Sequence, residues 1–76
     1  MDEKELTFGQ QAVGIKFNPS NDSAVDKCKQ AFAGLIDICY DIKTESYLGN
    51  TVRWEAIRVL IVAQMLVVKL LTLPTK

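Results

Sequence analysis

The chain has 76 residues, with nine basic and nine acidic side chains and no histidine, so its net charge is zero. A chain of this length forms one domain, and a lone copy buries only about 60% of its unfolded surface, so we expect it to need added support. Two cysteines are too few for a disulfide framework or a structural zinc site, and the balanced charge argues against a duplex-DNA binder. The acidic, polar start differs from a signal peptide, so we expect a cytoplasmic protein.

The first segment, residues 1–16, is predicted to be an N-terminal arm. Gly9 and Gly14 weaken any regular helix of this length, so we expect only one or two turns around residues 10–13. The arm is therefore a short element of a single domain that spans residues 1–76.

A first long helix is predicted from about residue 19 to about residue 44. Asn18 is a good N-cap and Pro19 suits the first helical position, with Asn21, Asp22 and Ser23 as further capping candidates. Apolar side chains recur at spacings of three and four residues, which is typical of a helix that packs along one face. This seam holds Val25, Cys28, Phe32, Leu35, Cys39 and Ile42, with Ala33 and Ile36 widening it to one side, and the opposite face carries Asp26, Gln30, Asp37 and Asp41.

Cys28 and Cys39 lie on this helix, roughly 16 Å apart along its axis, which is too far for a disulfide within the chain. We expect two reduced, buried thiols. A disulfide between chains is the alternative that the spacing leaves open.

A second long helix is predicted from about Thr51 to Thr72, after a turn over residues 45–50 in which Gly49 and Asn50 would break the chain. On a wheel at about 100° per residue, this helix presents two apolar arcs separated by polar stripes. One arc can cover the first helix in an antiparallel two-helix hairpin, and the other has no partner within one chain, which predicts self-association. The larger arc holds Val52, Ala56, Val59, Leu60, Ala63, Leu66, Val67 and Leu70, and the smaller holds Ile57, Ile61, Val68 and Leu71.

The alternative for this apolar helix is a membrane span. Its stretch from Ala56 to Leu73 is about the minimum length that crosses the hydrocarbon core. Arg58, Gln64 and Lys69 interrupt it, however, and a central charge costs roughly 2.5–3.5 kcal/mol. We therefore expect no membrane insertion.

The residue types that carry catalysis are scarce. Without histidine there is no Ser-His or Cys-His pair, and the chain has no Gly-rich phosphate loop, so we predict neither enzymatic activity nor a metal or cofactor. An anion site is possible at the predicted helix start near Pro19 and Ser20, with Phe17 to stack on a base and Lys29 to add charge. The alternative is that Phe17 packs over its own helix and its neighbours only cap it.

Arg58 and Lys69 form a cationic stripe on the second helix, about 20° apart on the wheel and some 16 Å apart in height. A solvent-exposed stripe with a Glu55–Arg58 pair is one explanation. In an oligomer, symmetry would instead gather copies of these cations, and such a cluster calls for an anion.

Several short motifs between residues 8 and 72 form one pattern. They are Phe8-Gly9, Ala12-Val13-Gly14-Ile15, Phe17-Asn18-Pro19-Ser20, Val25 with Lys29, Ala33, Ile36-Asp37, Glu55-Ala56-Ile57-Arg58, Ala63-Gln64-Met65, Val67-Val68-Lys69 and Thr72. In this order they resemble the phage hairpin-domain family of anti-CBASS and Thoeris anti-defence proteins. Departures from the family pattern are Asn21-Asp22 after the Phe-Asn-Pro-Ser motif, and Leu66 in place of an aromatic residue.

The resemblance implies a sponge made by a bacteriophage in the cytoplasm of its infected bacterial host. Such proteins bind cyclic di- or trinucleotides, or cyclic ADP-ribose isomers, without degrading them, and so block the effectors of bacterial immunity. The implied fold is an all-α helical hairpin with a short N-terminal element, assembled as a homo-oligomer (a dimer, and commonly a hexamer) with ligands between protomers.

The resemblance also implies ligand-binding roles for individual side chains. Phe17 would stack on a base and Lys29 would supply charge to a phosphate, with Arg58 as a second cation for the same or another pocket. The full set is Phe17, Asn18, Pro19, Ser20, Lys29, Arg58, Lys69 and Thr72. The rival interpretation of the sequence is a helical dimerisation or structural module with no small-molecule ligand.

Overall fold

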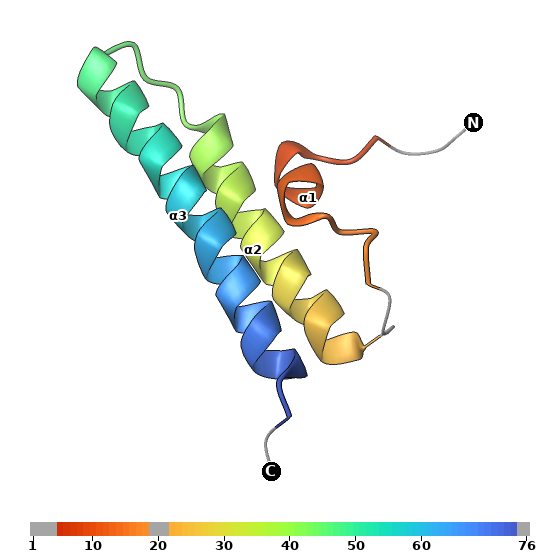
Figure 1. The fold of residues 1–76 in the computed structure, drawn as a ribbon. Coiled ribbons are helices and arrows are strands. Elements are labelled where there is room, and N and C mark those ends of the chain that lie inside the picture. The colour runs from red at the N-terminus through yellow and green to blue at the C-terminus, as the bar shows by residue number, and fades with distance from the viewer. Residues whose placement is uncertain (1–4, 19–21, 75–76) are drawn as a thin grey trace.

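The computed structural model of the chain describes residues 5–18 and 22–74. These residues form three helices, α1 (Phe8–Val13), α2 (Ser23–Asp41) and α3 (Tyr47–Thr72), and no strand, so the predicted all-α class is confirmed for the described part of the chain. The long helices α2 and α3 lie side by side, with a reversal of the chain between them, and α1 packs chiefly on α2 (Figure 1).

The two glycines of the arm shape α1, which lies where one or two turns are predicted. A capping box starts the helix, because Gln10 N donates to Thr7 Oγ1 at 3.1 Å and Thr7 N donates to Gln10 Oε1 at 2.9 Å. Gly14 ends it in the left-handed region with φ of 65°, where glycine is favoured. A Cβ on Gly9 would collide with the carbonyl oxygen of Ala33, so the missing side chain allows α1 to approach α2 closely.

The start of α2 lies later than the sequence predicts. Asp22 is its N-cap and accepts a hydrogen bond from Ala24 N at 2.8 Å. Asn18, the first capping candidate, instead donates its side-chain amide to Asp22 O at 3.0 Å and accepts from Asp22 N at 3.3 Å. The predicted position of Pro19 at the first turn falls outside the described residues.

The buried line of α2 is shifted from the predicted heptad seam toward the side that Ala33 and Ile36 widen. The buried residues are Val25, Lys29, Ala33 and Ile36, whereas Leu35 and Ile42 of the predicted seam are about half exposed. The reason is that α2 contacts α1 as well as α3, so its most buried line lies between these two neighbours. The core joins Val13, Ala33, Ile36 and Ile57 from all three helices.

The face of α2 that was predicted to be solvated is also partly used. Gly9 N donates to the carboxylate of Asp37 at 2.7 Å, across 28 positions in the sequence. This bond anchors the start of α1 to the last third of α2, and a carboxylate acceptor makes it a strong one.

The third helix begins four residues before the predicted Thr51. Ser46 is its N-cap and accepts from Gly49 N at 2.8 Å, so Gly49 and Asn50 lie in the first turn of the helix and do not break it. A side chain on Gly49 would collide with Thr44 and Ser46, which explains glycine at this position. The end of α3 at Thr72 agrees with the prediction.

The apolar arcs of α3 have different surroundings. Ile57 of the smaller arc is buried and Ile61 packs against the core, whereas much of the larger arc is exposed, including Val52, Leu66 and Leu70. Within residues 5–18 and 22–74, no helix is both long and apolar enough for a membrane crossing.

Candidate ligand-binding site

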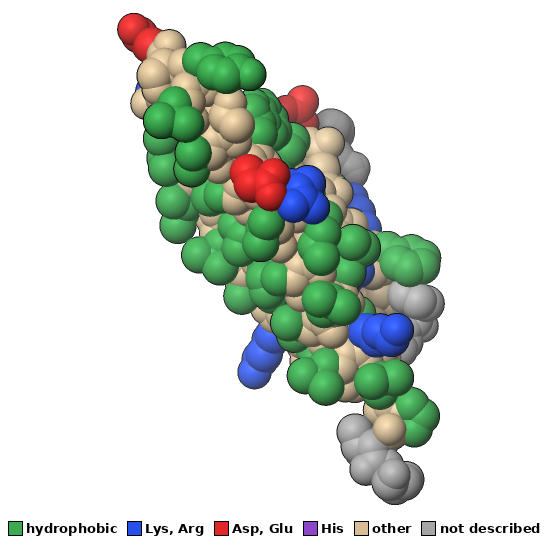
Figure 2. Space-filling model, turned by 60° about the vertical axis from the view of Figure 1, so that its left-hand side comes forward, with side chains coloured by type: hydrophobic (Ala, Val, Ile, Leu, Met, Phe, Trp, Pro, Cys, Tyr) green, Lys and Arg blue, Asp and Glu red, His purple; other side chains and the backbone are tan. Residues whose placement is uncertain are grey.

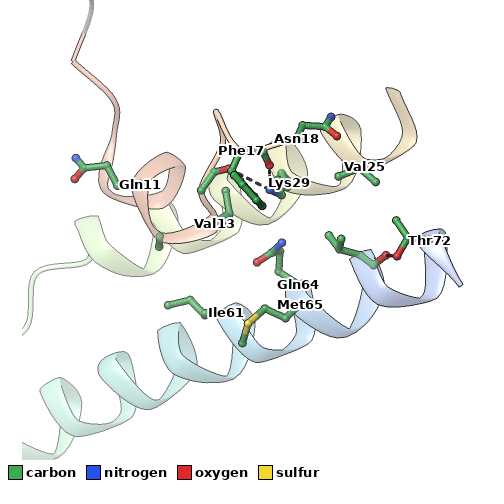
Figure 3. Close-up of a pocket in the computed structure, with 13 residues that line it drawn as sticks. Gln11, Val13, Phe17, Asn18, Val25, Lys29, Ile61, Gln64, Met65 and Thr72 are labelled. Carbon is green, nitrogen blue, oxygen red and sulfur yellow. Dashed lines mark hydrogen bonds between the residues drawn. The ribbon is translucent and has the colours of Figure 1, made fainter. Parts of the chain in front are cut away.

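A cavity of about 600 Å³ opens between the end of the arm, the first half of α2 and the second half of α3 (Figure 3). Its volume lies within the range of small-molecule sites, and its walls are mostly apolar with a few polar groups, as is typical of such sites. The lining comprises Gln11, Ala12, Val13, Gly14, Phe17, Asn18, Val25, Lys29, Ile61, Gln64, Met65, Val68 and Thr72.

Lys29 positions the segment that forms one rim of this cavity. Its side chain is only 6% exposed, and its Nζ donates to Gly14 O at 3.1 Å and to Phe17 O. The same nitrogen lies 5.5 Å from the centroid of the Phe17 ring, a cation–π contact. Lys29 therefore ties the chain that follows α1 to the body of α2.

The charge of Lys29 is not balanced by a carboxylate within the described part of the chain, where the ion pair found is Arg58–Glu55. An ammonium group carries three N–H donors, and the two carbonyl bonds use two of them. Burial of an uncompensated charge is costly. The arrangement can therefore hold an anionic group at the cavity wall.

Gln64 supplies the second buried polar group of the cavity. It interrupts the apolar stretch of α3, yet the residue is only 4% exposed, because this side of α3 faces the arm and α2. It extends from α3 toward Lys29 and Phe17 (Figure 3). No side-chain hydrogen bond joins it to residues 5–18 or 22–74.

Sequence reasoning did not select Gln64 as a site residue, although a signal was present. It is the one polar side chain in the run from Val59 to Val68, where apolar residues would serve a helix core equally well. A polar residue retained at the centre of an apolar run indicates either a buried network or a ligand contact.

The cavity brings together half of the predicted ligand-binding residues, namely Phe17, Asn18, Lys29 and Thr72. The Phe17 ring is 70% exposed at the rim, where a planar ligand could stack on it. Thr72 Oγ1 donates to Val68 O at 2.9 Å and to Lys69 O at 3.2 Å, so its hydroxyl can still accept a bond. Pro19 and Ser20 lie outside the described residues.

Arg58 and Lys69 do not line this cavity. Arg58 forms the predicted pair with Glu55, with Nη2 to Oε2 at 2.6 Å and Nε to Oε1 at 3.2 Å. Hydrogen bonding and charge in this pair lower the pKa of Glu55 and raise the pKa of Arg58. Arg58 borders a separate hollow beside Tyr47 and Trp54, and Lys69 lies exposed on α3.

A cluster of aromatic rings with one arginine lies at the end of the bundle away from the cavity, and the sequence analysis did not identify it. Phe8 stacks on Tyr40 at 4.2 Å between ring centroids, and Trp54 meets both rings edge-on. Arg53 lies over Trp54 at 4.8 Å and donates from Nη1 to Tyr40 O at 2.9 Å. Because these residues come from three helices, no local pattern in the sequence connects them.

The two cysteines are not joined to each other, and both are half-buried, so neither is as fully enclosed as predicted. Burial raises the pKa of the Cys28 thiol, although the neighbouring charge of Lys29 acts in the opposite direction. A raised pKa makes a thiol less reactive, so Cys28 is a poor nucleophile.

The outer side of α3 carries an extensive apolar surface. Hydrophobic side chains cover most of the length of the face shown in Figure 2. The exposed large residues of α3 include Val52, Val59, Val62, Met65, Leu66, Leu70 and Leu71. Large apolar patches are rare on the surfaces of monomeric soluble proteins.

Comparison of the chain with protein-family models, with curated proteins and with solved structures gave no match.

Proposed function

We propose that this protein is an oligomeric phage sponge that captures cyclic oligonucleotide or cyclic ADP-ribose-type immune signals without degrading them. The observation that carries the proposal is the cavity beside Lys29, where a buried ammonium group without a carboxylate partner in the described chain lies next to the exposed Phe17 ring. A phosphate would be attracted to the ammonium and a base could stack on the ring. The motif resemblance points to the same class of ligand.

Self-association is part of the proposal, with the helical hairpin of α2 and α3 as the repeating unit. The accessible surface is 5697 Å², compared with about 4,700 Å² expected for a compact monomer of this mass. The radius of gyration is 14.2 Å, compared with about 11 Å for a compact domain of this length. A second copy on the larger arc of α3 would cover much of this excess surface.

Capture without turnover suits the chemistry of the cavity. Among the described residues, its polar lining consists of amides, a hydroxyl and an ammonium group already bonded to two carbonyls, with no carboxylate or imidazole as a general base. Such a site can stabilise a bound anion, and it lacks the groups that would activate water.

Thermal melting tests the proposal with a panel of cyclic di-AMP, cyclic GMP-AMP, cyclic tri-AMP and cyclic ADP-ribose isomers. Ligand at 100 times its Kd adds about 2.7 kcal/mol, so the melting temperature should rise by roughly 10 °C or more. Lys29→Met should remove most of this shift, because it keeps the linear side chain and removes the charge. Lys27→Met is the matched control, since Lys27 is exposed on the same helix and does not line the cavity.

The second candidate function is a helical dimerisation module with no small-molecule ligand. The apolar outer side of α3 favours it, because that surface needs a partner whatever the cavity does. A well-folded oligomer whose melting responds to no member of the panel would support this second function and refute the sponge.

A further inference from the structure

Gln64 is a buried polar residue on an otherwise apolar stretch of α3. The residue is 96% buried and lines the cavity, and no side-chain hydrogen bond joins it to residues 5–18 and 22–74, so its amide faces the cavity. Leucine has a similar volume and would fill the same space without an unpaired amide. Buried polar groups without partners in the protein are uncommon, and each calls for an explanation.

The surroundings of Gln64 suggest what its amide could contact. Its neighbours on the lining, Ile61, Met65 and Val68, are apolar and can enclose the faces of a flat ring. The side chain extends toward the rim formed by Lys29 and Phe17 (Figure 3). A ligand with an anionic group at Lys29 and a planar body inside the cavity would therefore present the edge of that body to the amide.

A primary amide presents one acceptor and one donor side by side. The edge of adenine that carries N6–H and N7 offers the complementary donor and acceptor, and glutamine pairs with it through two hydrogen bonds. The corresponding edge of guanine carries two acceptors, O6 and N7, so it leaves the amide oxygen facing an acceptor. The amide thus favours adenine over guanine in this geometry.

We propose that Gln64 is the specificity-determining residue of the cavity and that it reads the N6/N7 edge of an adenine base inserted between α2 and α3. This inference rests on the proposed sponge function and names the ligand class more narrowly, as adenine-containing cyclic nucleotides. The base is held by two hydrogen bonds to Gln64, while Lys29 faces the phosphate.

The test uses isothermal titration calorimetry on the full chain with cyclic di-AMP, its 7-deazaadenine analogue and cyclic di-GMP. The wild type should bind cyclic di-AMP at least tenfold more tightly than either of the other two ligands. Gln64→Leu should weaken cyclic di-AMP binding by tenfold or more and remove the discrimination among the three. Gln30→Leu is the matched control, the same exchange at an exposed position of α2 that does not line the cavity, and it should leave the ranking unchanged.

Melting of the ligand-free proteins separates this role from a structural one. Gln64→Leu should melt at a higher temperature than the wild type, because it replaces a buried amide that lacks a protein partner. A lower melting temperature for Gln64→Leu would overturn the inference. Unchanged cyclic di-AMP binding by this variant would also overturn it, as would equal wild-type affinity for cyclic di-AMP and cyclic di-GMP. Each of these three results would leave the sponge function standing. If the wild type binds no member of the full messenger panel, the sponge function and the inference both fail.

Discussion

Gly9→Ala is expected to destabilise the fold strongly, although alanine is normally the better helix former. Elsewhere in a helix interior this exchange stabilises by about 1 kcal/mol. At position 9 the new Cβ would collide with the backbone carbonyl of Ala33, and overpacking against a rigid group costs about 1–3 kcal/mol. Moving α1 away would also break the bond from Gly9 N to Asp37, worth about 1.5–3 kcal/mol for a charged acceptor.

The net expectation for Gly9→Ala is a loss of about 2–4 kcal/mol in the free energy of unfolding. Urea unfolding followed by circular dichroism measures it, with all proteins at one concentration because an oligomer's stability depends on concentration. Gly34→Ala is the matched control, since its Cβ would meet nothing within 4 Å and should stabilise by about 0.5–1 kcal/mol. If Gly9→Ala stabilises as much as Gly34→Ala, α1 does not dock on α2 as described.

Two further predictions concern the outer surface of α3. The double variant Leu66→Glu/Leu70→Glu should be monomeric by light scattering, because it places two charges on the exposed apolar arc. Tyr47→Glu is the control and should keep the wild-type mass, since Tyr47 is also exposed but lies at the far end of α3. An unchanged mass for the double variant would place the interface elsewhere. Carboxyl NMR should give Glu55 a pKa below its ordinary value, and Arg58→Gln should return it to normal. Because the pKa of Glu55 is lowered in the folded state, the stabilisation from this pair is present above the unfolded pKa and is lost as the pH falls through the folded pKa. The change in stability is small, because both side chains are exposed. A Glu55 pKa that does not respond to Arg58→Gln would contradict the pairing.

The helical class and the end of α3 could be predicted because they depend on local signals. The apolar run of α3 is long and ends before Pro74, and proline commonly follows a helix end. The sequence predicts the start of α3 too late, because glycine commonly interrupts a helix. Glycine within four residues of an N-cap is tolerated when the cap satisfies its N–H, as Ser46 does here.

The buried face of α2 could not be predicted from the spacing of apolar residues alone. It depends on the docking of α1, which Gly9 and Asp37 fix through a contact between distant parts of the sequence. That docking turns Lys29 inward, where its Nζ finds backbone carbonyls of the segment after α1. A lysine in the helix therefore belongs to the most buried line, against its usual preference for the surface.

Only the part of the candidate site that lies close together in the sequence could be predicted. Phe17, Asn18 and Lys29 are close in sequence, and all three line one cavity. The contribution of α3 depends on how that helix is rotated about its axis, and the wheel alone left open which arc packs inward. Packing of the smaller arc brings Gln64 and Thr72 into the cavity and leaves Arg58 on the outside.

Recovery of the bound molecule tests the central claim most directly. The purified protein is incubated with a cyclic nucleotide from the panel, freed of unbound ligand by gel filtration, denatured by heat, and its supernatant is analysed by mass spectrometry. The sponge account predicts that the released molecule is chemically intact and present in a fixed ratio to the protomer. An empty supernatant for every member of the panel, or a hydrolysed product, would contradict it.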